Sequence, residues 1–259
     1  MHIFGLPQSL VDEIPIRVSH TGIDARYVDP AHVAMGFFKA SPEAFESYKY
    51  EGPPEGMRVG LDLQKIIEFL KKSKKLGESE KVEITITQDR VALKCGRVIA
   101  RFGLVDVMHM PEPKRPPMEK LPYSAVCVVR GEAFRIFAEA VNSIVETVGV
   151  EAVDFRAVGG KLLAVSEADV NEAVIEVGDL APWVGEDNTP RQIVEYHIDD
   201  KGEPQGLHAM FSLDYLVPIC KALPEREVSF VFGTNLPLFA QYEDEGISIE
   251  AMLAPRIGK

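Results

Sequence analysis

The hydrophobic residues of the chain follow a helical spacing in two places that lie about 150 positions apart. The first stripe consists of Leu63, Ile66, Phe69 and Leu70, and the second of Leu213, Leu216, Ile219 and Cys220. Asp62 and Ser212 precede the stripes as plausible N-caps, and Lys71 and Lys221 fall at matching places. This pattern predicts two similar amphipathic helices. A third helix is expected over residues 130–148, where Phe134, Phe137 and Val141 recur on one face.

Alternating apolar and polar positions predict strands around these helices. The expected strands are 17–21, 23–28, 33–38, 82–87, 90–95, 98–105, 153–158, 161–167, 171–177, 228–232 and 247–253. Gly159-Gly160 lies between two of them and is typical of a two-residue hairpin turn. The two halves are therefore expected to be of α+β type, each rich in antiparallel strand.

A proline-rich segment separates the two halves. Residues 108–118 contain four prolines, which disfavour both a helix and a central strand, so we expect an extended connector. The predicted organisation is an N-terminal domain at 1–107, a connector at 108–122 and a C-terminal domain at 123–259.

Composition narrows the class of protein without naming a function. The chain has 259 residues, of which 46% are hydrophobic and 26% charged, as in ordinary globular proteins. It shows neither a run of about 20 apolar residues, as a membrane span requires, nor a basic and then apolar export signal at its start. Cys95, Cys127 and Cys220 lie far apart and indicate a reduced, intracellular protein. A net charge of −12 argues against a simple nucleic-acid coat but allows basic residues gathered on one face.

Catalytic and metal-binding motifs are not found. The sequence has no phosphate-binding loop, no nucleophile elbow and no zinc-protease motif, and its six histidines show no metal-ligand spacing. We therefore expect no metal site and no cofactor, and a binding or structural protein rather than an enzyme. An enzyme that assembles its pocket from scattered carboxylates remains a distant alternative. The closing segment 253–257 either packs on its own domain or offers an edge to another chain.

Four segments together resemble the sliding clamps of the proliferating cell nuclear antigen (PCNA) family, particularly the archaeal ones. The segments are Gly22-Ile23 with 28–35 (VDPAHVAM), 211–216 (FSLDYL), 232–238 (FGTNLPL) and 253–257 (LAPRI). They occur in the order expected across a duplicated chain, and the similarity runs from about Leu10 to Ile257. The resemblance implies two similar clamp domains, antiparallel sheets outside and helices lining a trimeric ring that encircles duplex DNA.

The resemblance also implies three kinds of site. The expected DNA-facing residues are Lys65, Lys71, Lys72, Lys74, Lys75, Arg130, Arg135 and Lys221. The expected subunit edges are 97–105 and 171–177, with Arg97, Ile99, Arg101, Asn171, Ala173 and Ile175 at the interface. Glu68, Ala138 and Asp214 stand where relatives often have basic residues, which weakens the expected lining and suggests that other subunits supply part of the positive charge.

The third site is a pocket for short peptides with aromatic and aliphatic anchors, between the connector and the C-terminus. Its expected residues are His32, Val33, Met35, Met108, Met110, Pro111, Pro237, Ala254, Pro255 and Arg256. Unbranched methionine side chains suit a surface that repacks around different ligands. The partners implied by the resemblance are DNA polymerase, the clamp loader, flap endonuclease and ligase.

The N-terminus departs from the family pattern. Only 15 residues precede the segment that begins at Ile16, so the first strand and part of the first inner helix are expected to be missing. Either Met1 is an internal methionine of a longer protein, or this subunit has a reduced first domain. The first hypothesis for function is a DNA sliding clamp, located in the cytoplasm on the nucleoid. The closest alternative is a specialised subunit of a heterotrimeric clamp.

Overall fold

The computed structural model describes residues 4–75, 81–147, 149–168, 171–185 and 187–257. Residue 148, the last of the third expected helix, and the first three residues lie outside this part of the chain. The described elements of the second half are β8 (Ala125–Val129), α3 (Gly131–Thr147), β9 (Ala152–Val158), β10 (Lys161–Ala168), β11 (Asn171–Pro182), β14 (His208–Ser212), α4 (Leu213–Ala222), β15 (Val228–Phe232), β16 (Leu238–Asp244) and β17 (Ile247–Leu253). Two short strands, β12 (His197–Ile198) and β13 (Pro204–Gln205), form a separate hairpin.

The first half repeats this order with fewer residues. Its described elements are α1 (Gly5–Leu10), β1 (Glu13–Ser19), β2 (Gly22–Val28), β3 (Ala34–Ala40), a short 3-10 turn (Pro42–Ala44), β4 (Met57–Asp62), α2 (Leu63–Lys75), β5 (Val82–Ile86), β6 (Arg90–Cys95) and β7 (Val98–Gly103). The pairs β1·β2, β1·β4, β2·β3, β5·β6 and β6·β7 correspond to β9·β10, β9·β14, β10·β11, β15·β16 and β16·β17. The duplication expected from the two stripes is therefore present in the strand pairing.

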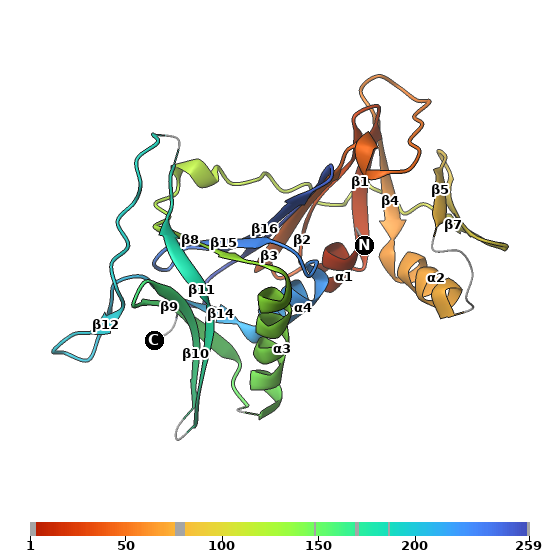
Figure 1. Cartoon of the computed structure of the whole chain (residues 1–259). Helices are drawn as coiled ribbons and strands as arrows, with labels where there is room; N and C mark the ends of the chain where they lie inside the picture. The colour runs from red at the N-terminus through yellow and green to blue at the C-terminus, as the bar shows by residue number, and fades with distance from the viewer. Residues whose placement is uncertain (1–3, 76–80, 148, 169–170, 186, 258–259) are drawn as a thin grey trace.

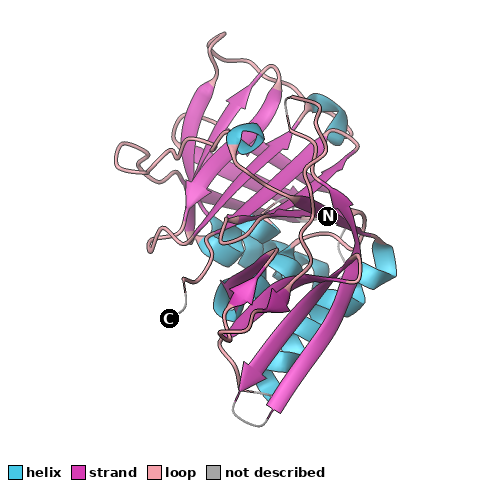
Figure 2. Ribbon diagram, turned by 90° about the vertical axis from the view of Figure 1, so that its left-hand side faces the viewer, coloured by secondary structure: helices cyan, strands magenta, loops and turns pink. Residues whose placement is uncertain are grey.

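One antiparallel sheet runs through both halves. Twelve described strands follow the order β14-β9-β10-β11-β8-β15-β16-β17-β3-β2-β1-β4, and β17 pairs with β3 across the two halves. The helices lie on one side of this sheet, and the connector crosses the other side (Figures 1 and 2). The apolar stripes of α2, α3 and α4 supply buried residues to a continuous core, among them Phe69, Phe137 and Leu216. The expected α+β architecture, with helices on one face of an antiparallel sheet, is thus confirmed.

Among the described residues, the first half does not show every element that the second half has. Helix α1 has 6 residues, whereas its counterpart α3 has 17. In the second half β8 joins β15 to the end of β11, but among the described residues no strand takes this place beside β5. As a result Val82 and Ile84 on β5 are exposed, while Val228 and Phe230 on β15 are buried.

Two boundaries differ from the sequence prediction by more than two residues. Strand β1 begins at Glu13 and passes through Pro15, rather than beginning at residue 17. Its pairing with β2 covers only residues 16–19, so the missing N–H of Pro15 breaks no bond of that ladder. The strand predicted at 171–177 continues to Pro182, because its last residues pair with β8. The Gly159-Gly160 turn forms as predicted, with φ angles of 59° and 76°.

Candidate DNA, partner and subunit surfaces

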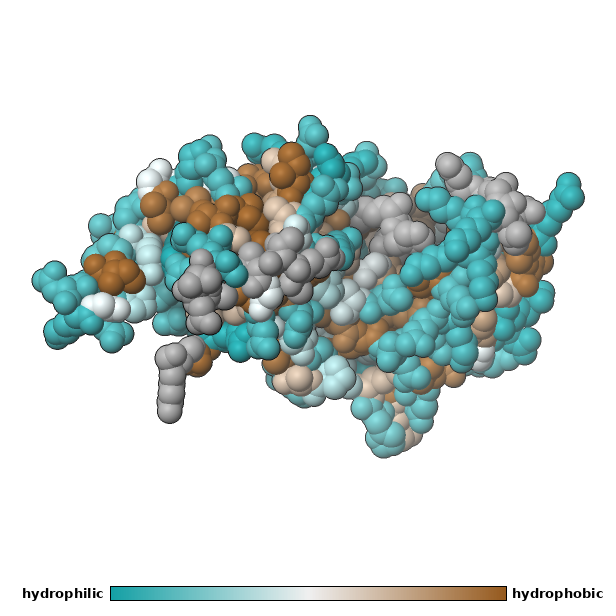
Figure 3. Space-filling model, turned by 90° about the horizontal axis from the view of Figure 1, so that it is seen from below, coloured by the Kyte–Doolittle hydropathy of each residue, from teal (hydrophilic) through white to brown (hydrophobic). Residues whose placement is uncertain are grey.

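The predicted DNA-facing residues lie on the helix side of the molecule. Five of them belong to α2, Arg135 belongs to α3, Lys221 belongs to α4, and Arg130 directly precedes α3. Figure 3 views the chain from this side, where mostly hydrophilic side chains surround smaller apolar patches. A helix side of this kind can meet the polar backbone of a nucleic acid, because its apolar stripes already face the sheet.

Most of these cations have a partner within the chain. The amino groups of Lys65 and Lys72 lie 2.7 Å from carboxylates of Asp62 and Glu68. The guanidinium of Arg135 lies 3.1 Å from Glu132 and 2.8 Å from Glu139. Two further contacts are an Arg130–Glu227 ion pair and a hydrogen bond from Lys221 to Asn142. Because the side chains of Lys65, Lys72, Arg130 and Arg135 are 37–71% exposed, their ion pairs are weak and a nearby phosphate can compete for the cations.

Three lysines at the end of α2 differ from the others. Lys71, Lys74 and Lys75 are exposed, and the described residues offer them no ion pair within 4.0 Å. Their position at a helix C-terminus is favourable, since the helix dipole is negative there. We call these three residues the α2 lysine cluster. Among the described residues of the helix side, it is the group of cations for which no ion pair is found.

One end of the sheet brings together most of the predicted peptide pocket. The register sets Leu253 opposite both Ala34 and Leu238, which places Pro237, Val33 and Ala254 side by side just beyond the strands. The amide of Ala254 donates to the carbonyl of Val33 at 2.9 Å, so the chain beyond β17 stays on the sheet. The tail then turns to the second half, where the amide of Arg256 donates to Met210 at 2.7 Å. Met35 lies next in the ladder, opposite Met252.

A tight turn before β3 fixes the position of His32. The buried carboxylate of Asp29 accepts hydrogen bonds from the amides of Ala31, Val33 and Ala34 at 2.7–2.9 Å. It also accepts one from the hydroxyl of Tyr215 on α4, at 2.9 Å. His32 has a φ of 58°, a left-handed backbone conformation that this turn holds in place. The Asp29 turn therefore links the pocket to the second half of the chain.

The first part of the connector closes a cleft against this turn. Arg58 on β4 donates hydrogen bonds to the carbonyls of Val107 and Met110, at 3.2 and 3.0 Å. Met110 and Pro111 then line a cleft of about 470 Å³ with His32. The other described lining residues are Val11, Asp12, Glu13, Pro15, Tyr27, Val28, Asp29 and Pro30. Met108 lies on the surface with 78% of its area exposed, outside this cleft.

Six of the ten predicted pocket residues thus form two groups. Val33, Pro237 and Ala254 lie at the sheet end, and His32, Met110 and Pro111 line the cleft under the connector. Val11, Glu13 and Val28 also line the cleft, although the sequence analysis did not name them. Val28 falls in a predicted strand, whereas no strand was predicted at Val11 or Glu13. Their place beside the connector depends on β2 and β1, the two strands that come before the last strand of the sheet, β4.

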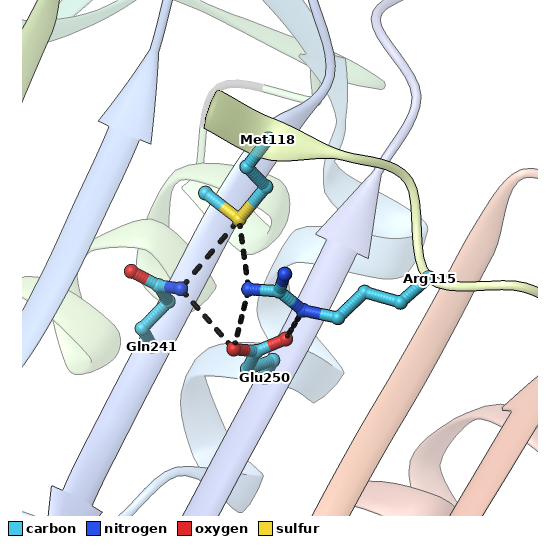
Figure 4. A network of polar contacts seen from close by, with 4 residues as sticks. All are labelled: Arg115, Met118, Gln241 and Glu250. Atoms are coloured by element: carbon cyan, nitrogen blue, oxygen red, sulfur yellow. Dashed lines mark hydrogen bonds and ion pairs between the residues drawn. The ribbon is translucent and has the colours of Figure 1, made fainter. Parts of the chain in front are cut away.

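The second part of the connector is held on the outer face of the sheet. The guanidinium of Arg115 donates two hydrogen bonds to Glu250 on β17, at 2.7 and 2.9 Å (Figure 4). Gln241 on β16 donates to Glu250 at 3.3 Å, and the Met118 sulfur lies within 3.6 Å of both Gln241 and Arg115. Beyond this network Met118 is buried with Tyr123 and Phe239. Residues 118–120 form a 3-10 turn, so the connector is extended only up to that point.

The two predicted subunit edges are strands with one unpaired side. β7 pairs with β6 alone, and β11 pairs with β10 over residues 171–179 but with β8 only over 180–182. Ile99 and Arg101 are exposed on the face of β7 that points away from the core, whereas Ala173 and Ile175 pack toward the core. The outward neighbours on β11 are Glu172, Val174 and Glu176, which the sequence analysis did not name.

The described residues contain no cluster of three or more metal-ligating side chains. No helix in the same part of the chain is long and apolar enough to cross a membrane. All three cysteines are buried. Burial raises the pKa of the Cys127 and Cys220 thiols to about 12, which keeps them in the unreactive thiol form.

Comparisons with known proteins agree with this architecture. A protein of Methanococcoides burtonii named DNA polymerase sliding clamp is 28% identical over 256 residues, which cover 96% of this chain and 91% of the relative. The solved structure of the C-terminal region of FEN-1 bound to Archaeoglobus fulgidus PCNA is similar with a TM-score of 0.74 and 25% identity, covering 99% of this chain and 94% of that one. The PCNA2–PCNA3 complex of Sulfolobus tokodaii has a TM-score of 0.71 at 21% identity, covering 98% and 94%, and shows the fold alone. No family model matches the chain. The resemblance seen in the sequence is confirmed.

Proposed function

We infer that this chain is a DNA polymerase sliding clamp of the PCNA family. The observation that carries this inference is the chain-long similarity to archaeal sliding clamps, together with a duplicated sheet that has helices on one side and a connector on the other. We expect it to act without catalysis, by tethering DNA polymerase and other replication and repair proteins to duplex DNA.

The DNA contact we propose is made by the helix side of a trimeric ring. The contacts are with phosphates, so they are independent of sequence and weaken as salt rises. The α2 lysine cluster supplies the strongest positive charge, while the paired cations on α3 and α4 contribute less. Acidic residues on the outside account for the net charge of −12. Such a surface lets the ring slide, because no base-specific contact has to be broken.

The partner surface we propose lies between the connector and the C-terminal tail. It combines the cleft at His32, Met110 and Pro111 with the sheet end at Pro237 and Ala254. The similar structure from A. fulgidus holds a C-terminal segment of FEN-1. We extend this kind of partner, a peptide with aromatic and aliphatic anchors, to this chain. Polymerase, clamp loader and ligase would bind in the same way.

The closest alternative changes only the assembly. The S. tokodaii complex joins two different clamp chains, so a heterotrimer with this chain as one subunit is the second candidate. The distant alternative is an enzyme on the same scaffold. The described residues contain no cluster of metal-ligating side chains that would favour it.

A polymerase assay on two templates tests the proposed function. With a clamp loader present, the protein should extend the processivity of an archaeal DNA polymerase on a primed circular template. The gain in processivity should be lost on an unblocked linear template, because a sliding ring can leave the DNA at a free end. Equal stimulation on both templates, or none on either, would contradict the clamp function.

Peptide binding tests the partner surface separately. An Ala254→Glu variant should bind the C-terminal peptide of an archaeal flap endonuclease at least tenfold more weakly, since it puts a charge into the apolar wall of the pocket. Ile136→Glu is the matched control, because Ile136 is exposed on α3 on the other side of the sheet. Calorimetric titration gives both affinities. Unchanged binding by Ala254→Glu would remove the tail from the partner surface.

A further inference from the structure

A group of arginines lies on the outer face of the sheet in the first half of the chain. Arg17 on β1 lies directly opposite Arg58 on β4, and Arg26 on β2 is a diagonal neighbour of Arg17. All three are exposed, whereas Ile16 and Ala25 beside them belong to the core. Because side chains alternate along a strand, the three guanidinium groups share the face that the connector crosses (Figure 1).

The contacts that hold these arginines are mostly with neutral groups. Like charges directly opposite each other destabilise a strand pair, so Arg17 and Arg58 need neighbours that offset their repulsion. The guanidinium of Arg17 donates to the carbonyl of Glu55 at 2.7 Å, and that of Arg58 donates to two carbonyls at the start of the connector. Arg26 makes no hydrogen bond and no ion pair with a described residue. Carbonyls orient the guanidinium groups but leave their positive charge in place.

Three carboxylates stand near the arginines without accepting hydrogen bonds from them. Glu55 contacts Arg17 through its carbonyl, and the carboxylate of Glu112 in the connector lies 3.9 Å from Nε of Arg58, too far for a hydrogen bond. Asp24 lies opposite Arg17 in the ladder, where burial raises the pKa of its carboxyl more than the neighbouring arginines lower it. Since a guanidinium has five N–H donors, most of the donors of this group remain for a ligand.

The arginines line a cleft that adjoins the proposed partner surface. We call this cleft of about 240 Å³, whose lining includes Arg17, Arg26 and Arg58, the arginine cleft. Pro15 lines both the arginine cleft and the cleft beside His32, so the two meet along β1. Arg17 follows Pro15 by two residues on the same face of the strand, a distance of about 7 Å. A peptide bound beside His32 therefore reaches the arginines after about two further residues.

We propose that the arginine cleft binds acidic side chains of a partner peptide whose anchors lie in the cleft at His32, Met110 and Pro111. The proposal rests on the partner surface inferred above and adds a charge requirement to the peptides that bind there. A chain with a net charge of −12 repels an acidic peptide at most places, so an acidic flank is favoured only where arginines gather. Each guanidinium can hold a carboxylate by two parallel N–H donors.

Four synthetic peptides test the proposal. They share the anchors of the C-terminal peptide of an archaeal flap endonuclease and carry three glutamates or three glutamines, on the N-terminal or on the C-terminal side of the anchors. On one of the two sides, glutamate should strengthen binding to the wild-type protein about fivefold over glutamine at low salt. This gain should shrink as salt rises, because the arginines are exposed. Calorimetric titration measures the four affinities.

Two variants locate the gain in affinity. Arg26→Gln should abolish most of it, and the fold should be unaffected because no described residue depends on a hydrogen bond from Arg26. Arg90→Gln is the matched control, since Arg90 is an exposed arginine of the same half that is paired with Asp89 on β6's own turn. The control should keep the full gain. A gain of equal size in the wild type and in Arg26→Gln, or no gain on either side of the anchors, would overturn the proposal.

The glutamine peptides keep this proposal apart from the partner surface itself. If they bind and glutamate adds nothing, the partner surface stands and the arginine cleft is overturned. If only a glutamate peptide binds, and Arg26→Gln abolishes that binding, the arginine cleft stands and the apolar anchor site is overturned. Binding of neither kind of peptide would overturn both.

Discussion

Asp29 shows how one buried side chain can hold the two halves of the clamp together. Burial of its carboxylate opposes ionisation, but hydrogen bonds from three backbone amides and from Tyr215 outweigh this cost and lower the pKa of Asp29. Its contribution to stability is therefore complete above the unfolded-state pKa of about 3.9 and is lost as the pH falls through the lower, folded-state pKa. The Asp29 turn should therefore lose stability at acid pH and keep it at neutral pH.

An Asp29→Asn variant should lower the free energy of unfolding by about 1–3 kcal/mol at pH 7, because the amide leaves buried N–H donors without their acceptor. The variant should also lose the part of the pH dependence of unfolding that the titration of Asp29 causes. Urea denaturation at pH 7 and below pH 4 measures both effects. Tyr215→Phe is the control, since it removes only one hydrogen bond and should cost about 1 kcal/mol. Equal losses for the two variants would mean that the backbone turn contributes nothing.

The Arg115–Glu250 pair should position the connector more than it stabilises the fold. Arg115 is 40% exposed at its side chain, so Arg115→Gln should change the free energy of unfolding by less than about 1 kcal/mol. The connector should nevertheless become more accessible, because two of its anchoring hydrogen bonds are gone. Limited proteolysis within residues 106–117 measures this effect. Lys114→Gln, a neighbouring charge with no ion pair to a described residue, is the control and should be cleaved at the wild-type rate.

At the scale of elements, α2 and α3 should differ in their contribution to DNA binding. Replacing the α2 lysine cluster by alanine should reduce the salt dependence of retention on nicked circular DNA by about 0.9 per lysine that contacts a phosphate. Arg135→Ala on α3 should change it less, because Glu132 and Glu139 already neutralise that cation. Lys72→Ala, whose partner is Glu68 on the same helix, is the matched control. A larger effect at Arg135 would place the main DNA contact on α3.

The open side of β5 should make the first half locally less stable than the second. β15 has neighbours on both sides and buries Val228 and Phe230, whereas β5 pairs with β6 alone. Amides of residues 82–86 should therefore exchange with solvent faster than those of 228–232 under native conditions. Hydrogen exchange followed by mass spectrometry measures the difference. Equal protection of the two strands would show that the open side of β5 does not lower the local stability of the first half.

The sequence predicted the helices and strands, and their repetition, better than it predicted which face of a strand each side chain occupies. The helical stripes and the Gly159-Gly160 turn depend on local spacing and formed where expected. The pairing of β17 with β3 joins residues more than 200 positions apart, which no local pattern contains. The inward direction of Ala173 and Ile175 depends on how β11 packs against the core. The predicted interface residues therefore come from both faces of their two strands, and the interface itself stays a prediction.

At the scale of the whole molecule, the edges and the open first half make stability depend on assembly. If β7 and β11 pair between copies, folding and association are linked, and the unfolding temperature must rise with protein concentration. A hundredfold increase should raise it by several degrees, since it adds on the order of 2.7 kcal/mol and a chain of this size gains about 2–4 °C per kcal/mol. Calorimetry at two concentrations measures this shift. The Arg101→Glu variant should unfold at a lower temperature than the wild type at the same concentration, because a reversed charge at the β7 edge weakens the pairing. An unfolding temperature equal to that of the wild type at both concentrations would mean that surfaces other than these two strands hold the ring together.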